Sequence, residues 1–416
     1  MTPGLGASGA GAIGERLTPR EIGRIDRVRA GGSALARCTP DPGAFLRETW
    51  GRRAEVLTGR PGATFTDLLS LDEVDRSLTS TALRTPYLRL VKAGEKIAES
   101  AYTRSGRTGS RDVAGIADPA RVASLFENGA TIVLQGLHRW SEPVARFCRD
   151  LELELGHPCQ VNAYVTPPGA QGLDLHEDPH DVFVLQAFGT KRWEIHAAPA
   201  ETPRDPFDAP VAPGDTVYLP TGTPHAARAQ EELSGHLTVG IHVTPWRDVL
   251  GGIVARTLAD DVGDLPAGWT EDRQGAATEL RRRLDVLTER LRGVDTHDEI
   301  ERRRERFLSN RPQLARGTIA ERSAPLEVDD RTTVRRRAGS ICELVVRDDI
   351  VVALLGDRRV ELPGWLEPTM RRIAELGDDE RLSVGALAAD LPSASSRAVL
   401  IGRLVREGLL TIRGEP

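Results

Sequence analysis

The chain has 416 residues, of which 39% are apolar and 28% are charged, and its formal net charge is -6. This composition can form two or three globular units, and the net negative charge excludes a general attraction to polyphosphate. Four scattered cysteines without a C-x-x-C pair argue against a disulfide framework, and no signal peptide or membrane-spanning apolar run is recognisable. We therefore predict a reduced, bacterial-type cytoplasmic location.

The first part of the chain differs in composition from the rest. Residues 1–35 are rich in glycine, alanine and arginine and have little periodic apolar content, which predicts a flexible leader. Apolar side chains then recur at helical spacing from Ser141 to Leu155, and β-rich stretches come next. For residues 36–248 we expect helices packed outside a β-barrel.

The triplet His176-Glu177-Asp178 is the most informative part of the strand-rich region. Residues i and i+2 of a strand point to the same face, so His176 and Asp178 can hold one ion while Glu177 points away. A turn rich in glycine and proline, residues 213–224, ends one strand and delivers His225 as a third ligand. Two imidazoles and one carboxylate are the set that binds redox-active iron and leaves coordination positions open.

Other candidate residues are weaker. His180 would share the face of Asp178, but Pro179 intervenes, and we favour a pocket role over packing or metal ligation. His236 and His242 are expected to be hydrogen-bonded rather than metal-bound. The chain has no G-x-S-x-G elbow and no glycine-rich phosphate loop, which excludes serine hydrolases of that type and P-loop ATPases.

A hairpin is predicted after the first two ligands, with strands at 181–188 and 191–196 around Gly189-Thr190. Lys191 opens its second strand and is one of only three lysines among 55 basic residues. Inside a barrel, its ammonium could pair with the buried carboxylate of a cosubstrate. A solvated hairpin lysine is an equally open interpretation.

The stretch from Asn162 to Trp193 resembles the JmjC-type ribosomal oxygenases, which are cupin-fold protein hydroxylases that use Fe(II), 2-oxoglutarate and dioxygen. The resemblance continues in the segments 45–50 and 235–239. It implies that the catalytic iron is held by His176, Asp178 and His225. It also implies that Lys191 pairs with the distal carboxylate of 2-oxoglutarate.

The same resemblance assigns further cosubstrate-pocket positions to Asn162, Tyr164 and Thr238. One position departs from the family pattern. Some members carry a hydroxyl two residues beyond Thr238, where this chain has Gly240. One cosubstrate contact is therefore expected to be missing or to be made by Thr238.

The chain after the barrel is predicted to be helical at first. Leucines 280, 284, 287 and 291 recur at steps of four, three and four, as on a helix that packs along one seam. The seam could pack against its own domain. The resemblance favours a homodimer instead, and we assign residues 249–318 to a helical dimerisation domain.

Residues 319–416 have the outline of a winged-helix domain. Helices are expected at 364–376, 384–389 and 395–406, followed by a short strand and turn at 407–414. Arg397, Arg403 and Arg406 on the last helix could bind DNA. We favour a role in assembly or substrate contact, because arginines in an arginine-rich chain are commonly a solvated face.

The sequence thus predicts an α+β protein with a double-stranded β-helix (cupin or jelly-roll, JmjC) catalytic domain at residues 36–248. Its expected function is 2-oxoglutarate-dependent hydroxylation of an arginine or histidine side chain of a ribosomal protein. Three alternatives stay open at this point: a hydroxylase of natural-product precursor peptides, a ligand-sensing winged-helix regulator without turnover, and a cupin enzyme that uses metal without 2-oxoglutarate. Direct nucleic-acid binding and a membrane location are not expected.

Overall fold

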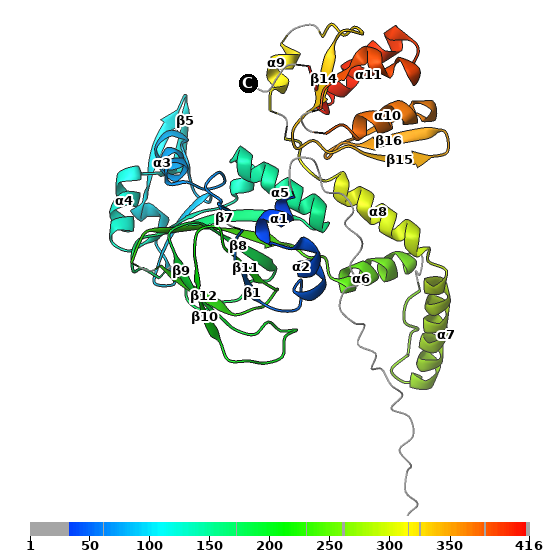
Figure 1. Ribbon diagram of the computed structural model, residues 1–416. Coiled ribbons are helices and arrows are strands. Elements are labelled where there is room, and N and C mark those ends of the chain that lie inside the picture. The colour runs from blue at the N-terminus through cyan, green and yellow to red at the C-terminus, as the bar shows by residue number, and fades with distance from the viewer. Residues whose placement is uncertain are drawn as a thin grey trace, which may run out of the picture. The chain divides into compact units, whose positions relative to one another are not determined.

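The computed structural model describes residues 33–412, except for 61, 172, 230, 260–262, 315, 324–325 and 378–379. Most of the predicted leader, residues 1–32, lies outside this part. Helix α1 (Ala34–Cys38) begins before the expected end of the leader, and its first two residues are buried. The chain forms two compact units (Figure 1): one contains Leu35–Leu137 and Gln160–Ile241, the other His138–Cys159 and the chain from His242 onward.

Two β-sheets form the body of the first unit (Figure 1). The larger sheet has the order β1-β11-β8-β13-β7-β6-β2-β3, and the smaller has the order β10-β9-β12. In the larger sheet the strands are β1 (Glu55–Leu57), β2 (Leu88–Lys92), β3 (Glu95–Lys96), β6 (Thr131–Leu134), β7 (Cys159–Thr166), β8 (Asp181–Phe188), β11 (Thr216–Leu219) and β13 (Ser234–Ile241). The smaller sheet consists of β9 (Lys191–Ile195), β10 (Phe207–Val211) and β12 (His225–Ala229). This is the jelly-roll arrangement expected of a cupin.

The hydrophobic core of the first unit lies between the two sheets. Val182 and Val184 of β8 pack in one cluster with Trp193 and Ile195 of β9. The other face of β8 is also buried, because the ring of Phe183 lies 5.3 Å from that of Phe45 on helix α2 (Pro42–Glu48). A strand buried on both faces reads as a continuous apolar run, which is how residues 182–185 appear in the sequence.

The predicted hairpin of strands 181–188 and 191–196 is wrong. Both strands exist, but β8 pairs with β11 and β13, whereas β9 pairs with β10 and β12. Gly189 turns the chain from one sheet to the other with a φ of 61°, and a Cβ there would lie 1.9 Å from the carbonyl oxygen of Leu233. The glycine therefore makes a corner of the barrel, because no side chain fits at this close approach.

The remaining elements of the first unit lie around this body. Helix α4 contacts β6, and the strands β4 and β5 form a separate two-stranded sheet. The helices are α3 (Leu71–Ser80), η1 (Glu99–Ala101) and α4 (Pro119–Glu127), and the two strands are β4 (Thr103–Thr108) and β5 (Arg111–Ala117). A short turn, η2 (Leu137–Arg139), follows β6.

The second unit is helical at first and then mixed. Its helices include α5 (Glu142–Leu155), α6 (Trp246–Thr257), α7 (Arg273–Arg292), α8 (Thr296–Leu308) and α9 (Thr318–Arg322). The C-terminal part adds two small sheets, ordered β15-β16-β17 and β18-β14-β19. Its elements are β14 (Thr333–Arg336), β15 (Glu343–Arg347), β16 (Ile350–Leu354), β17 (Arg359–Pro363), η3 (Gly364–Leu366), α10 (Glu367–Ala374), β18 (Leu382–Ser383), η4 (Val384–Ala389), α11 (Ala394–Arg406) and β19 (Leu410–Thr411).

Several helices lie where the sequence pattern placed them. The helix expected over 141–155 is α5, and the leucine-rich helix expected at 279–292 is the second part of α7. Helical turns also cover most of 364–376, 384–389 and 395–406. The winged-helix assignment itself stays a prediction, and the short strand after the last helix, β19, pairs with β14.

Arg397 does not belong to an exposed basic face. Its side chain is 4% exposed, and it donates two hydrogen bonds to the carboxylate of Asp330, at 2.9 and 2.6 Å. Its other nitrogen donates to the carbonyl oxygens of Leu391 and Pro392. A guanidinium used in this way is structural, so the DNA-binding interpretation loses one of its three arginines.

Among the described residues, no helix has the length and apolar character to cross a bilayer.

Candidate metal centre

His176 and His225 are held side by side by their own backbones. The amide of His176 donates to the carbonyl oxygen of His225 at 3.1 Å, and the amide of His225 donates back at 2.8 Å. The segment before Asp178 is thus tied to the edge of β12 at one reciprocal pair rather than running as a regular strand. The pair places the two imidazole rings 4.4 Å apart.

Asp178 completes the cluster. Its Oδ2 lies 3.8 Å from Nε2 of His225, and its carbonyl oxygen accepts a hydrogen bond from the amide of Gly222 in the turn before β12. One donor atom from each of His176, Asp178 and His225 lies within 4.8 Å of the other two. In the described part of the chain this is the one such group of histidine, cysteine and acidic side chains. The residues selected from the sequence therefore come together in space.

The hydrogen bonds of the two imidazoles settle which ring nitrogen can bind a metal. Nδ1 of His176 lies 2.8 Å from the carbonyl oxygen of Asp174, and Nδ1 of His225 lies 2.8 Å from that of Thr223. A carbonyl oxygen only accepts, so each Nδ1 carries the proton. Each Nε2 then has a free lone pair for an ion. Burial lowers the pKa of His225, which keeps its imidazole neutral as metal binding requires.

Asp181 supports the turn that delivers His225, a role that the sequence did not reveal. The residue is 2% exposed, and its carboxylate accepts hydrogen bonds from the hydroxyl of Tyr218 at 2.5 Å and from the amide and hydroxyl of Thr221 at 2.9 and 2.8 Å. A buried carboxylate needs such donors to offset its loss of water. The turn between β11 and β12 is thereby fixed beside the metal ligands.

A pocket opens beside the three ligands, and Lys191 lies in it. Lys191 is 3% exposed, and its ammonium donates to the hydroxyl of Thr166 at 2.9 Å and to Nδ1 of His236 at 3.1 Å. No carboxylate of the described residues pairs with it, and burial lowers its pKa to about 7. A buried cation with neutral partners is a site for an anion. The alternative of a solvated hairpin lysine is wrong.

The other predicted pocket residues differ in their placement. Tyr164 and Thr238 line the pocket with Lys191, whereas Asn162 is not among the lining residues and accepts a hydrogen bond from the amide of Gly136 at 3.0 Å. The ring of His236 stacks on Tyr164 at 5.1 Å with an angle of 4° between the planes. The complete lining is Thr131, Tyr164, Thr166, Leu173, His176, Asp178, Val182, Val184, Lys191, Trp193, His225, Ala227, His236 and Thr238.

Two pocket residues could have been found from strand alternation alone. Thr166 lies two residues beyond Tyr164, and His236 lies two residues before Thr238, so each shares the inward face of a residue already selected. His236 was expected to be a hydrogen-bonded histidine outside the ligand set, and it is buried and bonded to Lys191. Burial, aided by the neighbouring charge of Lys191, lowers its pKa well below the ordinary value.

His180 occupies the space that Gly240 leaves. A Cβ at position 240 would lie 2.7 Å from the His180 ring, whose Nε2 lies 3.3 Å from Nε2 of Gln160. His180 is not part of the metal cluster. Position 240 therefore has no side chain in this protein, and the imidazole of His180 occupies the space that a side chain there would need.

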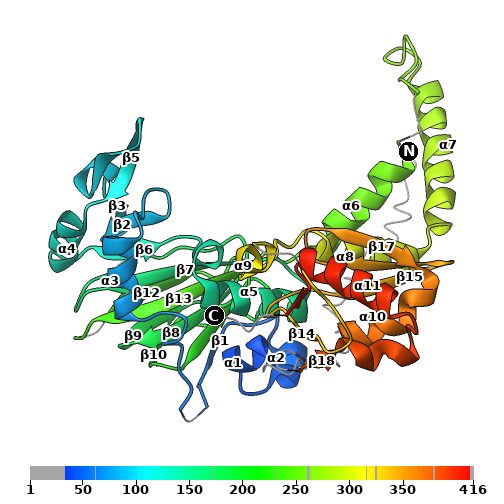
Figure 2. The same ribbon diagram turned by 90° about the horizontal axis from the view of Figure 1, so that it is seen from above.

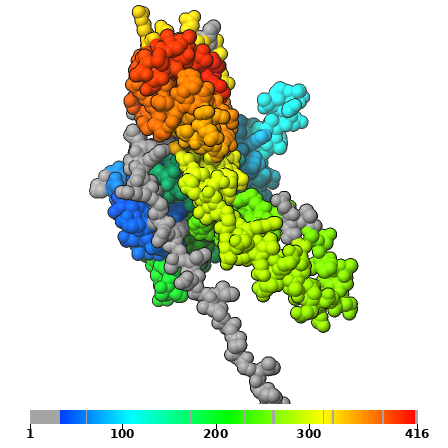
Figure 3. Space-filling model, turned by 90° about the vertical axis from the view of Figure 1, so that its right-hand side faces the viewer, coloured from blue at the N-terminus to red at the C-terminus, as the bar shows by residue number. Residues whose placement is uncertain are grey.

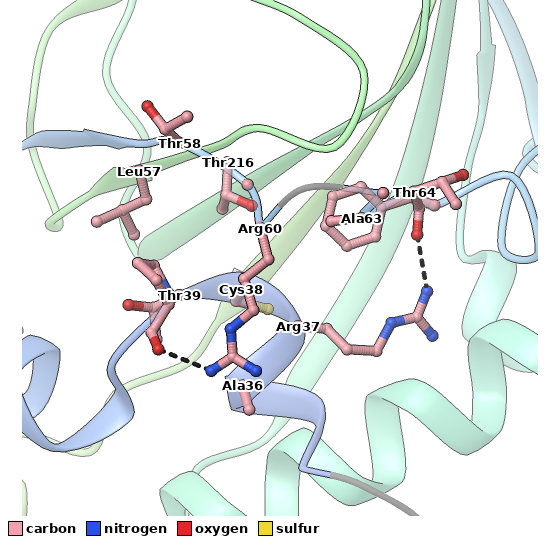
Figure 4. Close-up of a pocket in the computed structure, with 14 residues that line it drawn as sticks. Ala36, Arg37, Cys38, Thr39, Leu57, Thr58, Arg60, Ala63, Thr64 and Thr216 are labelled. Atoms are coloured by element: carbon pink, nitrogen blue, oxygen red, sulfur yellow. Dashed lines mark hydrogen bonds between the residues drawn. The ribbon is translucent and has the colours of Figure 1, made fainter.

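A second cavity, of about 320 Å³, lies elsewhere in the first unit, against α1 and β1 (Figure 4). Arg37 and Arg60 extend along it, but their guanidinium groups donate to the carbonyl oxygens of Thr64 at 3.3 Å and Pro40 at 2.7 Å. Arg37 also pairs with Asp67. This cavity has no group of potential metal ligands among the residues described, so the metal centre is the better functional candidate.

A jelly-roll barrel with two histidines and one aspartate at its mouth defines a cupin-type metal-binding protein. Comparison with known proteins is more specific. Residues 138–249 match the model of the JmjC domain. Human ribosomal oxygenase 1 is 28% identical over 231 residues, and the match covers 51% of this chain and 35% of that protein. Residues 138–249 thus form a JmjC domain, and over about half of its length the chain is similar to a ribosomal oxygenase.

Two further relatives are informative. The bifunctional lysine-specific demethylase and histidyl-hydroxylase NO66 of Drosophila pseudoobscura pseudoobscura is 29% identical over 255 residues, which is 56% of this chain and 26% of the relative. The structure of the Escherichia coli ribosomal oxygenase YcfD in complex with cobalt and 2-oxoglutarate has a TM-score of 0.50 and 18% identity, and covers 89% of this chain and 98% of that one. The chain spans about a third or less of the length of the human and Drosophila relatives, and the YcfD likeness shows the fold.

Proposed function

We propose that the protein is an Fe(II)- and 2-oxoglutarate-dependent oxygenase that hydroxylates a protein side chain. The observation that carries this proposal is the buried ammonium of Lys191 in the same pocket as the three metal ligands. A metal centre alone would also suit a cupin that works without 2-oxoglutarate. Such an enzyme has no use for a buried cation that lacks an anionic partner, whereas a dicarboxylate cosubstrate supplies one.

The residues have separable tasks. His176, Asp178 and His225 would hold the ion through two Nε2 atoms and one carboxylate, and leave positions for cosubstrate and dioxygen. With both bound, the centre supplies the oxidative decarboxylation of 2-oxoglutarate to succinate and carbon dioxide, with one oxygen atom left for a C–H bond. Lys191 fixes the distal carboxylate, and the stacked rings of Tyr164 and His236 exclude water around it.

The finer assignment concerns the substrate. Of the three proteins described above, two are named ribosomal oxygenases and one a lysine-specific demethylase and histidyl-hydroxylase. The histidyl-hydroxylase name supports a histidine, and the arginine alternative rests on the resemblance described above, so we infer that the substrate is a histidine or arginine side chain of a ribosomal protein. Hydroxylation of a natural-product precursor peptide is the second candidate function for the same chemistry. The cytoplasmic location of the protein stays a prediction.

Two measurements test the function. Purified protein given Fe(II), ascorbate and 2-oxoglutarate is expected to release succinate, and intact-mass comparison of ribosomal proteins from a deletion strain and its parent is expected to show one protein lacking a single oxygen atom. Unchanged ribosomal masses together with active succinate release would move the substrate to another protein. Absence of metal-dependent succinate release would refute the oxygenase proposal itself.

A homodimer is the second part of the proposal. On α7, Leu280 and Leu284 are 58% and 44% exposed, so the described residues leave the first half of the leucine seam uncovered, whereas Leu287 and Leu291 are partly buried. Apolar seams of this kind usually pack against another helix, and a second copy supplies one.

Charged residues on this seam are expected to break the dimer. The double variant Leu280→Glu, Leu284→Glu should elute as a monomer in size-exclusion chromatography with light scattering, whereas the wild type should be a dimer. Arg281→Glu with Asp285→Lys changes neighbouring α7 residues outside the leucine set and serves as the control. A wild-type monomer at micromolar concentration would contradict the proposal.

A further inference from the structure

The β4–β5 hairpin is a basic region of an acidic protein. Between Arg84 and Arg121 the chain has eight basic and four acidic residues, although the whole chain has a net charge of -6. Two of its three lysines, Lys92 and Lys96, also lie here. Figures 1 and 2 show the hairpin standing out from the body of the first unit, and in the space-filling view its cyan tip is exposed (Figure 3). The hairpin itself, residues 103–117, has three arginines and one aspartate, so the projecting element carries a net positive charge.

Strand register places three arginines of this hairpin on one face. Arg104 pairs with Ile116, and Arg84 forms a bridge with the same residue from the other side. Residues directly opposite each other in antiparallel strands share a face. The pairing register shifts between Arg104 and Gly106, but Gly106 still lies on the face of Ile116, and Thr108, two residues further along β4, shares that face and is paired with Arg111. The face therefore carries Arg84, Arg104 and Arg111.

A glycine contact supports this register. A Cβ on Gly106 would lie 2.9 Å from Cδ1 of Ile116, so the isoleucine side chain lies over the glycine on the same face. Arg107 points the other way, opposite Asp112. From the strand rise, Arg104 and Arg111 are about 13 Å apart along the ribbon. We name the surface formed by Arg84, Arg104 and Arg111 the arginine face.

The arginine face is exposed and has no internal counter-ions. All three side chains are exposed, and none has an acidic partner among the described residues. Elsewhere the arginines commonly pair with acids, as Arg121 does with Asp118 at the base of this region. Guanidinium groups gathered on one exposed face without paired acids attract a polyanionic partner.

The hairpin is held at its base rather than being a loose loop. The amide of Thr85 donates to the carbonyl oxygen of Gly115 at 3.0 Å, and Arg121 donates to that of Thr103 at 3.1 Å. Tyr102, just before β4, is 1% exposed. The arginine face is therefore presented in one orientation, which reduces the entropy lost on binding.

The same region reaches the metal centre. In the turn between β2 and β3, the amide of Ala93 donates to the carbonyl oxygen of Gln171 at 3.3 Å. A Cβ on the next residue, Gly94, would lie 2.1 Å from the carboxylate of Asp174, whose carbonyl oxygen accepts from the first metal ligand, His176. The basic region thus begins against the segment that carries the catalytic ligands.

We propose that the arginine face binds the phosphate backbone of RNA next to the substrate site. Guanidinium groups bind phosphate in a bidentate manner, and backbone contacts need only charge and spacing. A stable protein partner would require an apolar interface centre. The arginine face has only Val113 and Ile116 between its charges, and both are partly buried. The inference rests on the proposed function, because a ribosomal-protein substrate can be presented together with ribosomal RNA.

The test compares opposite faces of one hairpin. In fluorescence polarisation with a labelled 20-nucleotide RNA, Arg104→Gln is expected to weaken binding, while Arg107→Gln, with the same charge change on the other face, has a much smaller effect. The triple variant of Arg84, Arg104 and Arg111 to Gln should bind about tenfold or more weakly. For this variant, the slope of log affinity against log salt concentration should decrease in magnitude by about 2. This decrease corresponds to three lost phosphate contacts with a single strand.

Two results would overturn the RNA proposal: no salt-dependent RNA binding by the wild type, or equal losses for Arg104→Gln and Arg107→Gln. Poly-glutamate of similar length serves as the competitor, and equal affinity for it would assign the face to an acidic protein instead. Succinate release in the absence of RNA should be unchanged in the triple variant. A failure of the oxygenase proposal would appear in that assay and not in the RNA titration.

Discussion

Replacement of Asp178 by alanine is expected to remove metal binding and to abolish succinate release. The carboxylate is one of three donors at the centre, and no other acidic or histidine side chain of the described residues lies in the cluster. Loss of a neighbouring, indirect partner of a metal ligand already costs roughly 10- to 100-fold in affinity, so loss of the ligand itself should exceed that range. Titration with Co(II), followed by its visible absorption, measures the affinity directly.

Glu177→Ala is the matched control for Asp178→Ala. The neighbouring residue is an exposed carboxylate outside the metal cluster, and its removal changes the net charge by the same amount. The control should bind Co(II) and turn over as the wild type does. If Asp178→Ala kept both properties, or if Glu177→Ala lost them, the ligand assignment would be wrong.

Replacement of Lys191 by alanine is expected to weaken 2-oxoglutarate binding by about 100-fold or more, with the affinity for Co(II) little changed. The lysine ammonium is the buried cation of the pocket, and a desolvated charge pair is lost when one partner is removed, at a cost of roughly 3–5 kcal/mol. Calorimetric titration of the metal-loaded protein with 2-oxoglutarate measures this. A cupin that works without 2-oxoglutarate would retain full turnover in the alanine variant.

Cosubstrate affinity should also depend on pH in a way that identifies the lysine. Burial lowers the pKa of Lys191 to about 7, so the protonated form that attracts a carboxylate is dominant below that pH and declines above it. Affinity should therefore be level below pH 7 and fall by up to tenfold for each pH unit above it. Lys191→Arg keeps its charge throughout this range. Any binding by that variant should show no such decline, and a decline that persists would point to another group.

The sequence alone was sufficient to select the three residues that cluster at the centre and to predict much of the helical structure. Residue type and i, i+2 spacing selected His176 and Asp178, and the turn before His225 indicated how the third ligand arrives. The helices α5 and α7 were visible because a helix that buries one face repeats its apolar residues every three or four positions. These signals are local, so they do not depend on how the rest of the chain folds.

These local signals did not reveal which sheet each strand joins. The run from β8 through Gly189 to β9 has the pattern of a hairpin, yet the two strands enter different sheets, because their pairing partners come from β10 to β13 further along the chain. The Gly189 corner is required by the close approach of Leu233, which lies 44 positions away. Long-range packing therefore decided the barrel's topology.

The surroundings of Lys191 show most clearly what the tertiary structure decides. Composition made this lysine conspicuous, but equally suited a solvated side chain. Its burial, and its neutral partners Thr166 and His236 from two other strands, follow from how the sheets close around it. The sequence by itself determined which groups could bind iron, because ligand chemistry belongs to residue types. The tertiary structure decided that an uncompensated cation lies beside them, because burial and charge pairing are set by distant parts of the chain.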